Sequence, residues 1–490
     1  MTMLREFFDI TVDSAEIFKG LAIMDTEYAS HLNSRPVIYF TFKDCKADTI
    51  ESLLFKIGSV LLGEYAKYQQ VFNGSVDESK VCFSTFNLIY SKLVKHEIGR
   101  DFIELSVVAL EQAVYEYYKV KPILLIDEYD QPMMSSFEHG YNSKLKDFFA
   151  GFYGSALKGQ DSLHQALLTG IQRIAKESVF SQLNNIKVYT VLDKRYSEYF
   201  GLTHDETQEL LMCYGLALDD DVKRKYDGYV FGETEMYNPW SLLYYAETSV
   251  LKNYWINTSS NYLIHESIRG ADSLFREDFE KLISEGKARV VANLEVSFTE
   301  LGHRYTLWGL LINTGYLTVD GHADGFYYDV RIPNGEVRSE FAWILADQGN
   351  FRGEVLHDMF RRLMDRDMEG FMMIYSDLVI SCTSYYDAKE NAYHMLFLGM
   401  CITLIDLYKI TSNIESGHGR SDITMESLSV DRLHIIIEFK QGEDIEGLKD
   451  EALRQILDNR YYSGLSGEVL CIGLAHDKKR CAIAHETVAN

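Results

Sequence analysis

One short stretch near the end of the chain constrains its fold most: an acidic residue, a turn, and then a strand that ends in Glu-x-Lys. Residues 433–439, LHIIIEF, are almost wholly apolar and rich in β-branched side chains, which predicts a buried strand. Glu438 and Lys440 are two residues apart, so they point to the same face of that strand. Asp422 follows a glycine-containing turn in a shorter strand pattern, and the two carboxylates are expected to meet at neighbouring strand ends.

These residue types suit the hydrolysis of a phosphodiester bond. Carboxylate oxygens are preferred ligands of Mg²⁺, so Asp422 and Glu438 are the predicted metal ligands. Lys440 is predicted to orient a water and to offset negative charge on the phosphate. The set resembles the core motif of the PD-(D/E)XK nuclease superfamily. The alternative is a strand that ends in a solvated ion pair, because an Asp and a Glu-x-Lys occur together by chance in long chains.

Length and composition bound the other possibilities. A chain of 490 residues predicts two or three domains. The formal net charge of −25 argues against a protein that coats nucleic acid by bulk electrostatics, although it permits a local basic groove. We expect a cytoplasmic protein without a membrane segment: the start MTMLREFFDI lacks signal-peptide features, apolar runs are short, and the seven cysteines are scattered without a CxxC pair.

A second chemical pattern lies in the first half of the chain. Residues 123–126 predict a compact apolar strand that ends in Asp127 and Glu128, the form of a Walker B strand. In that form Asp127 holds Mg²⁺ and Glu128 faces a water beside the γ-phosphate of ATP. Thr169 follows a strand predicted over 165–168 and is a candidate phosphate sensor. Arg173 is a candidate for stabilising the negative charge that develops on the phosphate. The alternative is a buried strand that enters an acidic loop, with Arg173 in an ordinary turn.

The order of several segments adds specificity that no single motif has. Together they resemble a bacterial and archaeal AAA-ATPase-like family that carries a C-terminal PD-(D/E)XK nuclease domain. The resemblance covers almost the whole chain. It rests on LLIDEYDQP (124–132), TGIQRIAKESVFSQLNN (169–185), YFGLTHDE (199–206), YDGYVFG (226–232), YNPWSLL (237–243), YWINTSSN (254–261), LWGLLINTGYLT (307–318), IPNGEV (332–337), ENAYHMLFLGM (390–400) and the nuclease stretch.

One expected part of this family is missing from the sequence. Family members carry a phosphate-binding Gly-Lys-Ser/Thr loop, but no GxxxxGK[ST] pattern occurs here, and residues 286–288 (Gly-Lys-Ala) lack both the first glycine and the hydroxyl. Residues 2–10 resemble the segment directly after that loop. Either the start codon is placed too late or the gene is truncated, or the domain has lost nucleotide binding. We expect inefficient ATP hydrolysis by this chain, because the backbone N–H cradle and lysine would be absent together.

The nuclease resemblance implies further site residues. Glu390 matches an acidic position at the start of the domain's first helix, although a structural carboxylate favoured by the helix dipole is an equal alternative. Gln455, in a helix predicted over 448–462, matches a glutamine that approaches the active site. His394 is expected to be a satisfied, partly buried side chain, not a ligand. Arg420 contacts either a phosphate or a neighbouring acid.

The prediction is an α/β protein with three parts: a P-loop-NTPase-like (AAA-type) core without its first strand and loop (1–215), a mostly helical or winged-helix-like region (216–345), and a PD-(D/E)XK nuclease-like domain (346–490). The expected function is Mg²⁺-dependent hydrolysis of nucleic acid, with DNA favoured, coupled in full-length relatives to an ATPase that uses ATP and Mg²⁺. Two alternatives stay open: a non-enzymatic regulatory or protein-binding module, and an ATPase active only with an upstream extension. A homo-oligomer is also left open.

Overall fold

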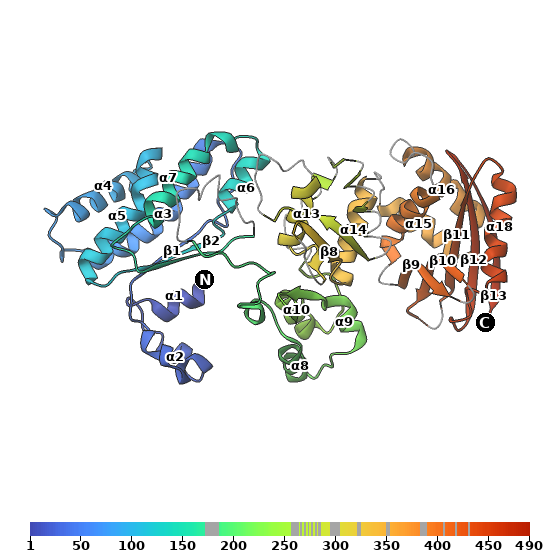
Figure 1. Ribbon diagram of the computed structural model, residues 1–490, viewed down its shortest axis with the longest axis horizontal. Helices are drawn as coiled ribbons and strands as arrows, with labels where there is room; N and C mark the ends of the chain where they lie inside the picture. Colours follow the sequence, from blue (N-terminus) through green and yellow to red (C-terminus); the bar gives the residue numbers. More distant parts are fainter. Residues whose placement is uncertain are drawn as a thin grey trace. The chain divides into compact units, whose positions relative to one another are not determined.

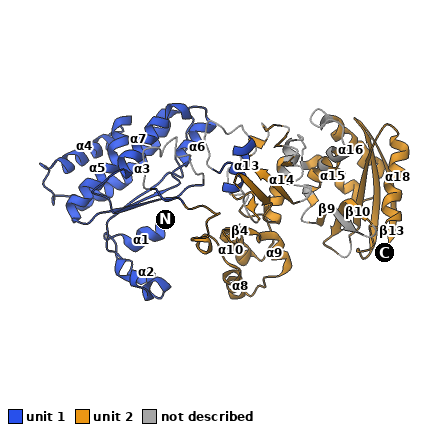
Figure 2. Cartoon of the chain, viewed as in Figure 1, with its two compact units in different colours: residues 1–188, 293–314 blue, residues 189–292, 315–490 orange. Residues whose placement is uncertain are grey.

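The computed structural model describes residues 1–171, 186–255, 286–294, 304–320, 325–348, 353–382, 390–404, 407–416, 419–429 and 432–490, together with short stretches between 264 and 282. The chain divides into two compact units, residues 1–188 with 293–314 and residues 189–292 with 315–490 (Figure 2). Each combines helices and strands, so the predicted α/β class is confirmed (Figure 1). In the described part of the chain, no helix has both the length and the apolar character needed to cross a bilayer.

A parallel three-stranded sheet organises the first unit. Its strands are β1 (Val37–Thr41), β2 (Ile123–Asp127) and β3 (Gln165–Leu168), in that order. Parallel neighbours need crossover connections, and helices supply them here. One face of the sheet packs against these helices in a large apolar core (Figure 1). The helices are α3 (Ile50–Phe72), α4 (Val81–Val94), α5 (Arg100–Tyr118), α6 (Gln131–Glu138), η3 (Asn142–Lys144) and α7 (Lys146–Leu157).

The opposite face of this sheet is covered in part by the start of the chain. Helix α1 (Thr2–Phe8) places Leu4 and Phe8 against Val37, Ile123 and Leu125. It is followed by α2 (Ala15–Phe18), η1 (Ala22–Asp25) and η2 (Glu27–His31), and α13 (Arg304–Asn313) also belongs to this unit.

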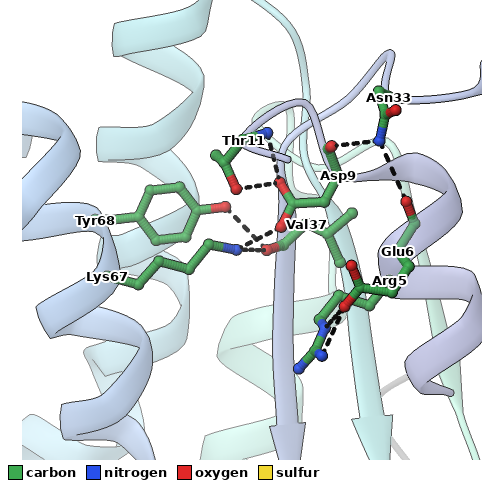
Figure 3. Close-up of polar contacts among 8 residues, drawn as sticks. All are labelled: Arg5, Glu6, Asp9, Thr11, Asn33, Val37, Lys67 and Tyr68. Atoms are coloured by element: carbon green, nitrogen blue, oxygen red, sulfur yellow. Dashed lines mark hydrogen bonds and ion pairs between the residues drawn. The ribbon is translucent and has the colours of Figure 1, made fainter. Parts of the chain in front are cut away.

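A buried polar network fixes the end of α1 against β1 and α3 (Figure 3). The carboxylate of Asp9 accepts hydrogen bonds from the backbone N–H and hydroxyl of Thr11, and it pairs with the Lys67 ammonium at 2.7 Å. Lys67 also donates to the carbonyl of Val37 in β1 at 3.1 Å, and Asn33 donates to the carbonyl of Asp9 at 2.9 Å. Because each buried charge has partners, the network joins three elements at low desolvation cost.

The part of the second unit that precedes the nuclease-like domain contains short helices and two small antiparallel sheets. Strands β4 and β5 form a hairpin, and the other sheet has the order β6-β8-β7. The elements are η4 (Ser197–Tyr199), α8 (His204–Cys213), α9 (Asp220–Tyr226), β4 (Tyr229–Phe231), β5 (Thr234–Met236), α10 (Pro239–Thr248), β6 (Lys287–Val291), β7 (Thr318–Val319), β8 (Tyr327–Arg331) and α14 (Gly335–Gln348).

Several of the family-like segments in this region meet at one buried carboxylate. Glu336 accepts hydrogen bonds from the Ser241 hydroxyl and from the backbone N–H of Trp255, both at 2.7 Å. In the same region, the carboxylate of Asp227 accepts a hydrogen bond from the Tyr237 hydroxyl at 2.8 Å. The segments around residues 227, 241 and 336 thus take part in hydrogen bonds that stabilise the packing of this region.

The C-terminal part of the second unit is a five-stranded mixed sheet of order β13-β12-β11-β10-β9. Only β11 and β12 run parallel, and the other pairs are antiparallel. Helices α15–α17 pack on one face and α18 packs on the other. The elements are α15 (Gly353–Met364), α16 (Met368–Cys382), α17 (Glu390–Met400), η5 (Cys401–Leu404), β9 (Tyr408–Ser416), β10 (Gly419–Ser427), β11 (His434–Gln441), α18 (Ile445–Asp458), β12 (Glu468–Asp477) and β13 (Arg480–Ala489).

Candidate functional site

Strands β10 and β11 bring Asp422 and Glu438 together. Their Cα pairing ends at Ile423 and Ile437, and both acids lie one residue beyond that pair. The carboxylate Oδ2 of Asp422 accepts the backbone N–H of Phe439 at 2.8 Å, and the N–H of Asp422 donates to Glu438 Oε2 at 3.4 Å. The expected meeting of Asp422 and Glu438 at neighbouring strands is therefore present in the structure.

Helix α18 adds Gln455 to these two acids. Its Nε2 donates to Glu438 Oε1 and also to the Tyr461 hydroxyl, the latter at 3.1 Å. The helix lies very close to β12 because residue 473 is glycine: a Cβ there would lie 2.6 Å from the backbone nitrogen of Leu453 and would also overlap the carbonyl of Lys449. Gly473 is the Cα partner of Glu438 in the neighbouring strand. The close approach therefore sets the distance between α18 and the sheet next to Glu438.

Lys440 supplies the positive charge next to these acids. Its Nζ lies 3.4 Å from Glu438 Oε1, and its side chain is only 18% exposed. Strand alternation places both residues on the same face of β11, as the spacing predicted. The four predicted residues Asp422, Glu438, Lys440 and Gln455 thus form one cluster.

The electrostatics of this cluster favour an additional cation. Burial, followed by the charge of Asp422, raises the pKa of Glu438 to about 7, while Lys440 acts to lower it. Burial also raises the pKa of Asp422, against the lowering effects of the Phe439 N–H and Lys440. Two buried carboxylates that repel each other are stabilised in their charged form by a positive charge placed between them.

A divalent metal ion fits the chemistry of this donor set. The cluster offers carboxylate oxygens, which Mg²⁺ prefers, and Mg²⁺ keeps several water ligands, so two protein carboxylates suffice. No group of three or more His, Cys, Asp and Glu side chains suited to a metal ion occurs among the residues that the structure describes. The fit therefore depends on Asp422 and Glu438, and their roles as ligands stay a prediction.

The structure describes only some of the other residues that were predicted for the nuclease site. Glu390 is the first residue of α17, but its side chain is outside the described residues, as is that of Arg420 in β10. His394 is buried, as expected, and burial lowers its pKa to about 4. The backbone of Asp422 acts in the opposite direction, against this lowering of the pKa.

The predicted nucleotide-side residues gather at the carboxyl end of the first sheet. Asp127 is the last residue of β2, and its Oδ1 accepts the Thr169 hydroxyl at 2.5 Å, directly after β3. Glu128 has a left-handed backbone with φ of 51°, and burial and the Asp127 charge raise its pKa while Lys43 lowers it. Arg173 lies outside the described residues. Carboxyl ends of parallel strands are common ligand sites, but the roles of these residues stay predictions.

Comparisons with known proteins match both ends of the chain. Residues 1–180 match the family model described as predicted AAA-ATPase, and residues 388–486 match the PD-(D/E)XK nuclease superfamily. A curated relative, the uncharacterized protein in the vnfD 5' region of Azotobacter chroococcum mcd 1, is 26% identical over 363 residues. That match covers 69% of this chain and spans 65% of the relative's length. These two matches support a predicted AAA-ATPase domain in the first part of the chain and a PD-(D/E)XK nuclease superfamily domain near its end.

Proposed function

We propose that residues 346–490 form a nuclease domain that hydrolyses phosphodiester bonds in nucleic acid with Mg²⁺, and that DNA is its substrate. The observation that supports this most is the convergence of Asp422, Glu438, Lys440 and Gln455 on one face of the mixed sheet. A structural ion pair would not need two buried carboxylates whose pKa values are both raised by burial. The arrangement costs stability, and a metal-dependent reaction gives a reason for it.

In this proposal Asp422 and Glu438 hold the metal ion between β10 and β11. The bound metal would lower the pKa of a water and offset charge on the phosphate. The N–H of Phe439 keeps the Asp422 carboxylate turned toward Glu438, and Gln455 fixes Glu438 Oε1 from the other side. These bonds hold both ligands in place before substrate arrives, which lowers the cost of ordering them.

Lys440 has a separate role in this proposal. It is the basic side chain whose ammonium reaches Glu438, and its low exposure means that little water screens its charge. We assign to its Nζ the orientation of the attacking water and the stabilisation of the negative charge that develops on the phosphate oxygens. Its charge is needed most in the transition state, so its loss would lower kcat more than it weakens DNA binding.

Metal removal tests this proposal directly. The purified chain of residues 1–490 is expected to cleave labelled DNA in Mg²⁺, to stop when EDTA is added, and to recover when excess Mg²⁺ is restored, because the proposed reaction needs a metal ion to activate the water. Single-stranded DNA, double-stranded DNA and RNA of one sequence should be compared at matched concentration. Cleavage that continues undiminished in EDTA would contradict the proposal, and cleavage of RNA alone would contradict the assignment of DNA.

A further inference from the structure

A basic turn lies at the end of the sheet that carries the proposed nuclease residues. Strands β11 and β12 run parallel, so both end at the same side of the sheet. Lys440, near the end of β11, is the Cα partner of Ala475 in β12. Strand β12 then leads into a two-residue turn, Lys478 and Lys479, before β13 begins. This turn starts about 10 Å along the strand from the partner of Lys440.

Neighbouring elements hold the backbone of this turn in place. The Tyr393 hydroxyl, from α17, donates to the Lys478 carbonyl at 2.7 Å. Arg480, the first residue of β13, pairs with the Asp477 carboxylate and donates to the Glu443 carbonyl at 3.4 Å, just beyond the end of β11. These contacts fix the place at which the two lysine side chains leave the sheet.

The charges of Lys478 and Lys479 have no partner within the described part of the chain. Both residues are exposed, and neither ammonium forms an ion pair or a hydrogen bond with another described residue. Two carboxylates are close to the turn, and both act on Arg480: Asp477 through an ion pair and Glu443 through its charge. The turn therefore presents two positive charges to solvent in a chain whose formal net charge is −25.

The backbone conformation of Lys478 disfavours a lysine. Its φ is 54°, in the left-handed region that Gly, Asn or Asp usually occupy in two-residue hairpin turns. Packing gives no reason for a lysine at this position, because the side chain is exposed. A contact between its ammonium and a molecule outside the domain gives one.

From these observations we propose that Lys478 and Lys479 form a phosphate-binding subsite, which holds the backbone of the DNA strand beside the cluster around Glu438 and Lys440. This inference rests on the proposed function for the identity of the ligand. A span of about 10 Å corresponds to about three phosphates along one strand of B-DNA. Lysine contacts to phosphates position a nucleic acid without reading its bases, so the subsite acts on DNA binding and not on the chemical step.

Three double variants separate the charge of the turn from its shape and from the net charge of the chain. Lys478→Gln/Lys479→Gln removes both positive charges and keeps long polar side chains. Lys478→Arg/Lys479→Arg keeps both charges. Arg366→Gln/Lys409→Gln is the matched control, since it removes two positive charges at the opposite end of the same sheet. There Arg366 pairs with the first residue of β12 at 2.6 Å, and Lys409 pairs with a glutamate near the end of β10 at 3.0 Å.

The probe is a labelled DNA duplex, titrated with the chain of residues 1–490 in EDTA, so that binding is measured without cleavage. Kd is measured between about 50 and 200 mM NaCl, a range over which phosphate contacts weaken strongly. We expect the slope of log Kd against log [NaCl] to fall by about 1.8 in the glutamine variant, about 0.9 for each lost phosphate contact. Its loss of affinity should then be about tenfold larger at the low-salt end than at the high-salt end.

Cleavage kinetics in Mg²⁺ on the same samples give a second readout. KM for DNA should rise in the glutamine variant while kcat stays close to the wild-type value, because the lysines contribute equally to binding the substrate and the transition state. The arginine variant and the control variant should both keep the wild-type salt slope and KM.

The outcomes separate this inference from the proposed function. A wild-type salt slope and KM in the glutamine variant overturn the subsite, even if the wild type cleaves DNA. An equal change in the control variant also overturns it, since net charge alone would then explain the effect. A wild type that binds DNA but cleaves no nucleic acid overturns the proposed function, while a lower slope in the glutamine variant would still support the subsite. A wild type that neither binds nor cleaves DNA overturns both.

Discussion

Glu438→Gln is expected to abolish cleavage and, in metal-free buffer at pH 8, to raise the melting temperature. Glu438 is 3% exposed and its pKa is raised to about 7 by burial and by the nearby charge of Asp422. When the pKa of a carboxyl is higher in the folded state, the protein loses stability as the pH rises above the ordinary pKa of that group, here 4.5. At pH 8 the charged form of Glu438 therefore destabilises the folded state. The amide of glutamine removes that charge, and its oxygen can still accept the hydrogen bond from Gln455.

Mg²⁺ should reverse the order of the two melting temperatures. A ligand that binds the folded state alone stabilises it by an amount that grows with its concentration, about 2.7 kcal/mol at 100 times Kd. The wild type should gain this stabilisation, whereas Glu438→Gln has lost one of two ligands and should gain little. Differential scanning calorimetry with and without Mg²⁺ measures both effects. Retained cleavage, or an equal gain from Mg²⁺ in both proteins, would contradict the assignment of Glu438.

The second large effect is expected in the first unit, at Glu111 in α5. This side chain is fully buried, and neither carboxylate oxygen has a hydrogen-bond partner among the described residues. Burial raises its pKa to about 9, so the folded state binds a proton at neutral pH that the unfolded chain releases. Stability should therefore fall by up to about 1.4 kcal/mol per pH unit between pH 5 and pH 9.

Glu111→Leu should remove this pH dependence and stabilise the first unit. At pH 8 we expect a gain of about 3 kcal/mol, or roughly 6–12 °C in melting temperature for a unit of this size. Thermal unfolding at pH 5, 6.5 and 8 measures it. Gln112→Leu is the control, because residue 112 is exposed on the same helix and should keep the wild-type pH slope. A steep slope that persists in Glu111→Leu would show that another group titrates.

Patterns of side chains predicted most of the fold around the two predicted sites. Apolar runs identified β2 and β11, and the pattern of residues 448–462 identified α18 to within a few residues. The spacing of Glu438 and Lys440 predicted their shared face, since alternation in a strand is a local property. The edge strand β9 was not predicted, because its polar, partly exposed sequence carries little periodicity.

Contacts that depend on backbone atoms could not be predicted in the same way. The N–H of Phe439 donates to the Asp422 carboxylate, yet almost every residue has such a backbone group. Gly473 likewise gives no sequence pattern, although its missing side chain lets α18 approach β12. The buried carboxyl of Glu111, which has no hydrogen-bond partner in the described part of the chain, runs against the usual expectation for an acidic residue, and only tertiary packing reveals it.

The central claim is that the cluster around Asp422, Glu438 and Lys440 cleaves nucleic acid, and Lys440→Ala tests it most directly. Cleavage of labelled DNA in Mg²⁺ should be measured under single-turnover conditions for wild type and variant, purified side by side. Loss of the ammonium, which lies 3.4 Å from Glu438, should lower the cleavage rate by about 100-fold or more, with DNA binding and melting temperature nearly unchanged. Equal cleavage rates for the two proteins would contradict the claim.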